Sequence, residues 1–145
     1  MKPNSELLLA FDFGLARIGV ASGNTLTDTA TPVGTLESRG RLPWQDIDAI
    51  VARWGPGQLV VGLPSDDETN PLVQRIRGFA AGLAERYGLP VSMIDESHTS
   101  AEAARNLRED RASGRRRRRV TRGTIDSHAA CLIAIRWMQS SGGSE

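Results

Sequence analysis

Several acidic residues end apolar segments, where an ionised carboxylate without a partner would be costly to bury. Asp12 lies near the end of the run from Leu7 to Phe13, and Asp95 and Glu96 follow the run that begins at Val91. Each could simply be a polar strand end that leads into a turn or a capping box. Because adjacent strand residues point to opposite faces, only one of Asp95 and Glu96 can face a given site.

A further carboxylate, Asp126, falls in the first turn of a helix expected from Thr124 to about Gln139. The helix dipole favours a negative charge at this position, and this stabilisation is the ordinary explanation for an acidic residue there. In folds with parallel strands, the carboxyl ends of the strands meet in a ligand crevice. Carboxylates that converge there repel one another unless a cation neutralises them, and oxygen ligands select Mg²⁺ or Mn²⁺ over Zn²⁺.

The histidines and the single cysteine give little indication of a metal site. His98 and His128 each lie two residues from a candidate ligand, but their spacing matches no zinc motif, so surface or hydrogen-bonding roles are expected. Cys131 lies in an apolar run and is interpreted as a buried small hydrophobe.

The charge distribution is strongly asymmetric although the net charge is only +1. The segment from Arg111 to Arg122 holds seven arginines and no acid, which leaves 11 of the 18 basic residues against all 17 acidic residues elsewhere. Such a separation suggests a polyanion such as nucleic acid, although basic runs are often only solvated. No apolar stretch is long enough to cross a bilayer, so we expect a soluble cytoplasmic protein without a membrane partner.

The elements expected from the hydrophobic pattern alternate after an initial meander. Strands are predicted at Leu7–Phe13, Arg17–Ser22, Val33–Leu36, Gln58–Leu63 and Val91–Asp95. Helices are predicted from Pro43 to Trp54, from Asn70 to Tyr87, from Thr99 to about Leu107, and from Thr124 onward.

This order predicts an α/β fold with a five-stranded mixed sheet flanked by helices, in which strands 1–3 are antiparallel and strands 4–5 are parallel. Such an arrangement is typical of ribonuclease H-like and actin-like folds. We expect one domain over residues 1–139 and a flexible tail over residues 140–145.

Four blocks of the sequence resemble a family of small bacterial proteins described as pre-16S ribosomal RNA nucleases and as Holliday junction resolvase-like proteins. They are LLLAFDFGLARIGVA near the N-terminus, VVGLP with the following helix and FAAGLAERYGLPV, DESHTSAEAARNL, and IDSHAACLI. The resemblance implies a ribonuclease H-like fold and catalytic, metal-binding carboxylates at Asp12, Glu96 and Asp126. It also implies Mg²⁺- or Mn²⁺-dependent phosphodiester hydrolysis in maturation of the 5′ end of small-subunit ribosomal RNA.

In this interpretation one or two divalent ions activate a water, and a set of arginines holds the phosphates of the nucleic acid. These arginines are Arg17, Arg115, Arg116, Arg117, Arg118, Arg119 and Arg122. The sequence departs from the family at Ser97-His98, where Arg-Leu is usual, and at SDDET (residues 65–69), so contacts there cannot be transferred.

Two alternatives stay open at this point, and the sequence disfavours a third. The enzyme could cleave branched DNA as a Holliday junction resolvase, or the chain could be a nucleic-acid-binding adaptor without catalysis. A sugar-kinase or actin-like ATPase would need a second phosphate loop and a second domain, which do not fit in 145 residues. The sequence does not distinguish RNA from DNA as the substrate, endonuclease from exonuclease action, or a monomer from a homodimer.

Overall fold

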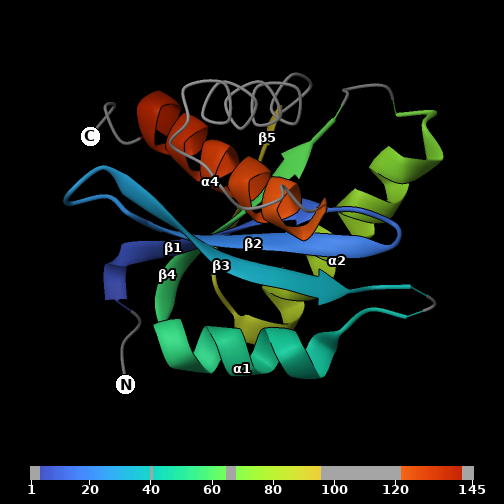
Figure 1. Ribbon diagram of the computed structural model, residues 1–145, viewed down its shortest axis with the longest axis horizontal. Coiled ribbons are helices and arrows are strands. Elements are labelled where there is room, and N and C mark those ends of the chain that lie inside the picture. Colours follow the sequence, from blue (N-terminus) through green and yellow to red (C-terminus); the bar gives the residue numbers. More distant parts are fainter. Residues whose placement is uncertain (1–3, 40, 65–67, 96–121, 142–145) are drawn as a thin grey trace, which may run out of the picture.

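The computed structural model describes residues 4–39, 41–64, 68–95 and 122–141, which form a five-stranded sheet with helices on both faces (Figure 1). The sheet order is β3-β2-β1-β4-β5. The strands are β1 (Asn4–Phe13), β2 (Arg17–Asn24), β3 (Thr29–Glu37), β4 (Pro56–Leu63) and β5 (Val91–Asp95). The helices are α1 (Trp44–Trp54), α2 (Pro71–Tyr87) and α4 (Arg122–Ser141). β1, β2 and β3 pair antiparallel, whereas β4 and β5 run parallel to β1, so the predicted mixed sheet is confirmed.

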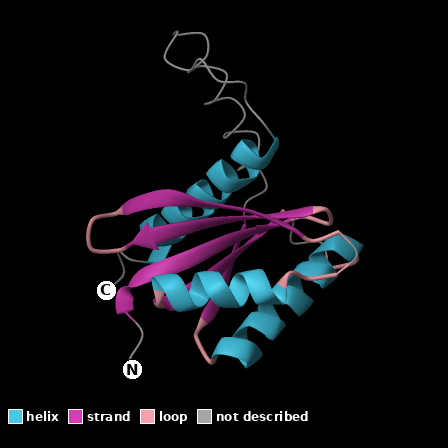
Figure 2. Cartoon of the chain, turned by 60° about the horizontal axis from the view of Figure 1, so that its bottom comes forward, coloured by secondary structure: helices cyan, strands magenta, loops and turns pink. Residues whose placement is uncertain are grey.

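The two faces of the sheet are covered by different helices (Figure 2). Along β1, Leu9, Phe11 and Phe13 belong to the core shared with α1 and α2. Leu8 and Ala10 instead belong to the core under α4. Because strand side chains alternate, Asp12 lies on the face that α4 covers.

Helix α2 has the start, stop and buried stripe that its sequence predicts. The Asn70 side chain accepts a hydrogen bond from the Leu72 amide at 2.9 Å, Pro71 occupies the first helical position, and Gly88 ends the helix in the left-handed conformation. Ile76, Phe79 and Leu83 are buried against the sheet. The Phe79 ring meets the Phe11 ring edge-on at a centroid distance of 5.6 Å, which fixes α2 over the centre of β1.

A polar clamp joins α1 to α2 at the surface. Arg86 donates two hydrogen bonds of 2.7 Å to the Asp48 carboxylate, and the Tyr87 hydroxyl donates a third at 2.6 Å. The Arg86 guanidinium also lies 5.2 Å from the centre of the Trp44 ring. The hydrogen bonds from Arg86 and then Tyr87 lower the pKa of Asp48 to about 2, whereas burial and the Asp48 charge raise the pKa of Tyr87.

Most element boundaries differ from the expected ones by a few residues. β1, β2, β3 and β4 are longer than predicted, because polar or turn-forming residues at their ends are held by pairing with neighbouring strands. α4 begins at Arg122 and continues to Ser141, so the helix extends beyond Gln139 at its C-terminal end. The helix predicted from Thr99 to Leu107 lies outside the described residues.

The sequence also predicted that Cys131 is buried and that no segment crosses a membrane. Cys131 is buried against the sheet as expected, and burial raises the pKa of its thiol to about 11, which keeps the sulfur protonated and unreactive. Among the helices that the structure describes, none combines the length and the apolar character of a membrane span.

Candidate active site

Asp12 lies at the carboxyl end of β1 between two glycines. In the β1–β2 pairing it faces Gly19, and the β1–β4 register, in which Phe11 pairs with Val61, puts Gly62 beside it on the other side. Both glycines are buried and neither contributes a side chain to the α4 face. The residues directly beside Asp12 on the two neighbouring strands therefore place no side chain against its carboxylate.

Helix α4 brings its N-terminal part toward this end of the sheet. Ala130 and Cys131 pack against Ala21 of β2, which pairs with Ala10, two residues before Asp12. Ser127, one turn earlier in the helix, is also buried. Figure 1 shows α4 crossing the sheet with its orange N-terminal end on the side of the β1–β2 turn. The backbone of Asp126 is thereby directed to the same edge of the sheet as Asp12.

The short turn after β1 also carries Arg17, the first residue of β2. Alternation places Arg17 on the face of Gly19, and so on the face of Asp12, to which it is a diagonal neighbour across the two strands. This arrangement puts a positive charge next to the predicted carboxylate site.

A serine 24 residues away in the sequence fixes the turn. The Ser38 hydroxyl donates to the carbonyl oxygen of Gly14 at 2.9 Å and also lies 3.2 Å from that of Leu15, and the Ser38 amide donates to the Ala16 carbonyl at 2.9 Å. Ser38 is buried, with 7% of its surface exposed. Sequence reasoning missed this residue, because a single serine after β3 carries no signal that it contacts a turn so distant in the chain.

Asp95 lies on the other face of the sheet. In β5, Val91 packs with the core under α1 and α2, whereas Ile94 packs with the core under α4. The alternation therefore places Asp95 with Val91, on the face opposite Asp12. Its carbonyl oxygen accepts a hydrogen bond of 3.1 Å from Arg136 of α4, which ties the end of β5 to that helix.

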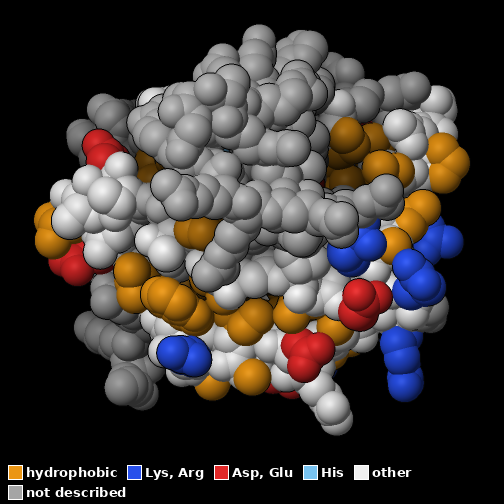
Figure 3. Space-filling model, in the orientation of Figure 1, with side chains coloured by type: hydrophobic (Ala, Val, Ile, Leu, Met, Phe, Trp, Pro, Cys, Tyr) orange, Lys and Arg blue, Asp and Glu red, His pale blue; other side chains and the backbone are white. Residues whose placement is uncertain are grey.

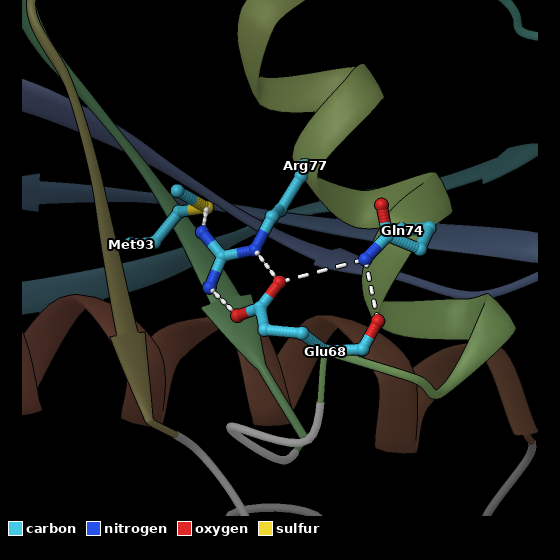
Figure 4. A network of polar contacts seen from close by, with 4 residues as sticks. All are labelled: Glu68, Gln74, Arg77 and Met93. Carbon is cyan, nitrogen blue, oxygen red and sulfur yellow. Dashed lines mark hydrogen bonds and ion pairs between the residues drawn. The ribbon is translucent and has the colours of Figure 1, made fainter.

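The chain that leaves β4 at the same edge is anchored to α2 by Glu68 (Figure 4). The Glu68 carboxylate forms a two-armed ion pair with Arg77, in which Arg77 Nε donates at 2.7 Å. Gln74 donates to the Glu68 carbonyl oxygen at 2.6 Å, and Arg77 also reaches the Met93 sulfur of β5 at 3.9 Å. These contacts fix Glu68 between α2 and β5.

The structure therefore places some of the predicted site residues and not others. Asp12 and Arg17 are described in full, whereas Arg122 and Asp126 are described by their backbone in α4. Asp126 is the fifth residue of α4 and so lies beyond the first turn in which the sequence had suggested it. Glu96, His98 and Arg115 to Arg119 lie outside the described residues, and His128 is half-buried in α4.

Within the described residues, no three His, Cys, Asp or Glu side chains gather into a group that could hold a metal ion. The one predicted ligand whose side chain is described, Asp12, offers a carboxylate in a space left open by two glycines, and oxygen is the donor type that Mg²⁺ and Mn²⁺ prefer.

Comparison with known proteins gives consistent results over nearly the whole chain. The model of the RuvX family, described as Holliday junction resolvase, matches residues 6–140. A protein of Francisella philomiragia named "Putative pre-16S rRNA nuclease" is 40% identical over 136 residues, which cover 92% of this chain and 96% of the relative. A Legionella pneumophila protein of the same name is 39% identical, and the match covers 92% of this chain and 95% of that protein.

The fold has counterparts among solved structures. Thermus thermophilus RuvC, in a structure with a Holliday junction substrate, superposes with a TM-score of 0.56 at 15% sequence identity, over 93% of this chain and 96% of RuvC. The predicted ribonuclease H-like fold is thereby confirmed as that of RuvC.

Proposed function

Because this chain belongs to the RuvX family, we propose that it is a divalent-metal-dependent nuclease that hydrolyses phosphodiester bonds of the precursor of 16S ribosomal RNA. The position of Asp12 carries the proposal. It is a carboxylate at the carboxyl end of the central strand, flanked by Gly19 and Gly62 and covered by the helix that bears Asp126. A carboxylate that faces the space left by two glycines can coordinate a cation through its oxygen atoms.

Asp12, Glu96 and Asp126 would hold the metal ion. A bound Mg²⁺ or Mn²⁺ would lower the pKa of a coordinated water and stabilise negative charge on the leaving oxygen. The choice of Glu96 over Asp95 is supported by the alternation in β5, which assigns Asp95 to the face opposite Asp12.

The chain's own arginines would hold the nucleic acid in place. Arg17 lies on the face of Asp12, so its guanidinium can bind a phosphate next to the one that is cleaved. Arg122 and the arginines from Arg115 to Arg119 precede or begin the helix that carries Asp126, and would bind phosphates further along the strand. Contacts of this kind position a strand without reading its sequence.

We propose a branched-DNA resolvase as the second candidate function. The description of the RuvX family model favours it, and so does the fold shared with RuvC. The two functions use the same carboxylates and differ in the substrate that the surrounding surface accepts. Nucleic-acid binding without hydrolysis is the third outcome that an experiment must distinguish.

The experiment compares Asp12→Asn with Asp95→Asn on ribosomal RNA precursor fragments, single-stranded DNA and four-way DNA junctions, with Mn²⁺ or with chelator. We expect the wild type to cleave the RNA precursor in Mn²⁺ only. Asp12→Asn should abolish cleavage, because it removes the charge of a metal ligand with little change in shape.

Asp95→Asn is the matched control, since it neutralises a strand-end acid on the opposite face, and it should retain cleavage. Equal cleavage by wild type and Asp12→Asn would refute the assigned site. Preferential cleavage of the junction would establish the second candidate instead, and binding without cleavage of any substrate would establish the adaptor.

A further inference from the structure

A cavity lies on the other side of the β1–β2 turn from Asp12. It has a volume of about 390 Å³ and is lined by Phe13, Leu15, Ser38, Arg41, Leu42 and Arg75. A second cavity of about 540 Å³ adjoins it, since Arg41 and Leu42 line both. Pockets that bind small molecules range over roughly 300–1,000 Å³, so either cavity is large enough to take a ligand group. Neither contains a residue of the predicted nuclease site.

The arginines of this cavity differ from most other described arginines. Arg77, Arg86 and Arg136 each donate hydrogen bonds to an acid or a carbonyl oxygen. Arg41 and Arg75 are exposed, and neither forms a hydrogen bond or an ion pair with any described residue. Figure 3 shows basic side chains gathered on the right of the molecule, the side on which the β1–β2 turn lies in Figure 1. The cavity therefore presents two guanidinium groups that can bind an anion.

The cavity also has apolar walls. Leu15, at the tip of the turn, is 60% exposed, whereas Phe13 at the base of the turn is 8% exposed. Leu42 is partly buried against the core under α1 and α2. Ser38 holds the turn through its hydrogen bonds to Gly14 and Leu15, so the exposed leucine is presented from a fixed backbone. An anion-binding pair next to apolar side chains matches the two parts of a nucleotide, its phosphate and the face of its base.

We propose that this cavity binds an unpaired nucleotide of the substrate strand, adjacent to the bond that is cleaved at Asp12. Arg41 and Arg75 bind the phosphate, and Leu15 and Leu42 contact the base. Asp12 and Phe13 are consecutive residues with side chains on opposite faces of the sheet. A strand that leaves the Asp12 site and crosses the β1–β2 turn therefore reaches Leu15 and then the cavity.

An unpaired nucleotide suits this site better than a duplex does. In a duplex the bases are stacked inside, so a cavity beside the backbone can contact only phosphates and sugars. The apolar walls at Leu15 and Leu42 would then have no partner. This inference rests on the proposed nuclease function, and it adds that the nucleic-acid strand is unpaired next to the cleaved bond.

The test measures binding of a short fluorescein-labelled single-stranded RNA and of the same sequence as a duplex, by anisotropy in chelator over a range of salt concentrations. The variants are Arg41→Gln/Arg75→Gln and Leu15→Ala. The control is Arg53→Gln, which removes an exposed arginine that lines a different cavity, between β3 and α1. The KM and kcat of cleavage in Mn²⁺ are then measured for each variant.

The double arginine variant should bind the single strand more weakly, with a salt slope lower by about 0.7, the contribution of the one phosphate that the arginine pair no longer neutralises. Leu15→Ala should weaken single-strand binding without changing the salt slope and should leave duplex binding unchanged. In cleavage, KM should rise in both variants while kcat stays the same, because the contact is made equally in the ground state and the transition state. Arg53→Gln should behave as the wild type.

An equal loss of single-strand and duplex binding in the double variant would overturn the proposal, because the arginines would then be a general phosphate contact. Wild-type binding in all variants would overturn it as well, and would leave the nuclease function intact if cleavage persisted. A wild-type protein that neither bound nor cleaved RNA or DNA would refute the nuclease function and this inference together.

Discussion

At the scale of single residues, the proposed nuclease site depends on close backbone packing at the turn after β1. An ideal Cβ added at Gly14 would lie 2.7 Å from the carbonyl oxygen of Arg17, closer than real Cβ atoms approach backbone. The turn therefore needs glycine for space, and any larger residue must move the segment that joins Asp12 to Arg17.

We predict that Gly14→Ala lowers the free energy of unfolding by about 1–3 kcal/mol, the usual cost of overpacking. Gly78→Ala is the control, because a Cβ there meets no atom within 4 Å and the position is exposed in the middle of α2. That variant should gain about 0.5–1 kcal/mol from helix propensity. Urea denaturation measures both, and a Gly14→Ala protein as stable as the wild type would show that the turn adjusts without strain.

The same scale shows where a site can be predicted from sequence. Asp12 was recognisable as a candidate because a carboxylate stands in an apolar strand. Alternation within a strand showed only that Asp95 and Glu96 cannot both face one site, and the choice of Glu96 came from the family resemblance. Ser38 was not recognisable, since its role arises from a contact across 24 residues of sequence. That Arg41 and Arg75 line one cavity could not be predicted for a similar reason, because the two residues come from different segments and lie near each other only in the folded chain.

At the scale of elements, the clamp between α1 and α2 links stability to pH. The lowered pKa of Asp48 means that its folded form binds a proton less readily than the unfolded chain. The clamp therefore stabilises the fold fully above the ordinary pKa of 3.8 and loses this contribution as the pH falls from about 4 through 2.

We predict that Asp48→Asn is less stable than the wild type at neutral pH and that the difference shrinks as the pH falls through this window. Urea midpoints measured from neutral pH down to pH 2 test this prediction. In an Arg86→Gln background, which removes the largest cause of the shift, the effect of Asp48→Asn and its pH dependence should both be smaller. A difference that stayed constant with pH would contradict the assigned ionic clamp.

The elements themselves were predicted with unequal success, for physical reasons. α2 carries its own signals, an Asn cap, a proline at the first position, an apolar stripe and a terminal glycine, and β5 matches its predicted bounds. β2 and β3 contain residues such as Asn24 and Pro32, which have low strand propensity or favour turns. Pairing with neighbouring strands holds them extended, and a local sequence pattern cannot reveal this effect.

At the scale of the whole molecule, charge is divided between one basic segment and an acidic remainder. Arg115 to Arg119 lie outside the described residues and remain a proposal based on the sequence. If these five arginines neutralise about five phosphates of a single strand, a fourfold rise in salt should weaken binding on the order of 100-fold.

We predict that replacing the five arginines with serine flattens this salt dependence and lowers affinity for every sequence tested, while kcat at saturating substrate is retained. Filter binding of single-stranded RNA at several salt concentrations measures the slope. The Arg53→Gln protein again serves as the control for loss of positive charge elsewhere. An unchanged slope in the serine variant would identify the run as a solvated segment without a role in binding.

The position of α4 has a consequence for how the protein emerges from the ribosome. Leu8, Ala10 and Val60 are made early, yet the residues that cover them, Ile133, Ala134 and Met138, are made last among the described elements. Until α4 has left the exit tunnel, the other described elements leave this face of the sheet uncovered, and its apolar side chains are exposed in the nascent chain. Since the same helix carries Asp126, a nascent chain without α4 also lacks part of the proposed metal site, and under the proposed function it would not cut nucleic acid before α4 has folded.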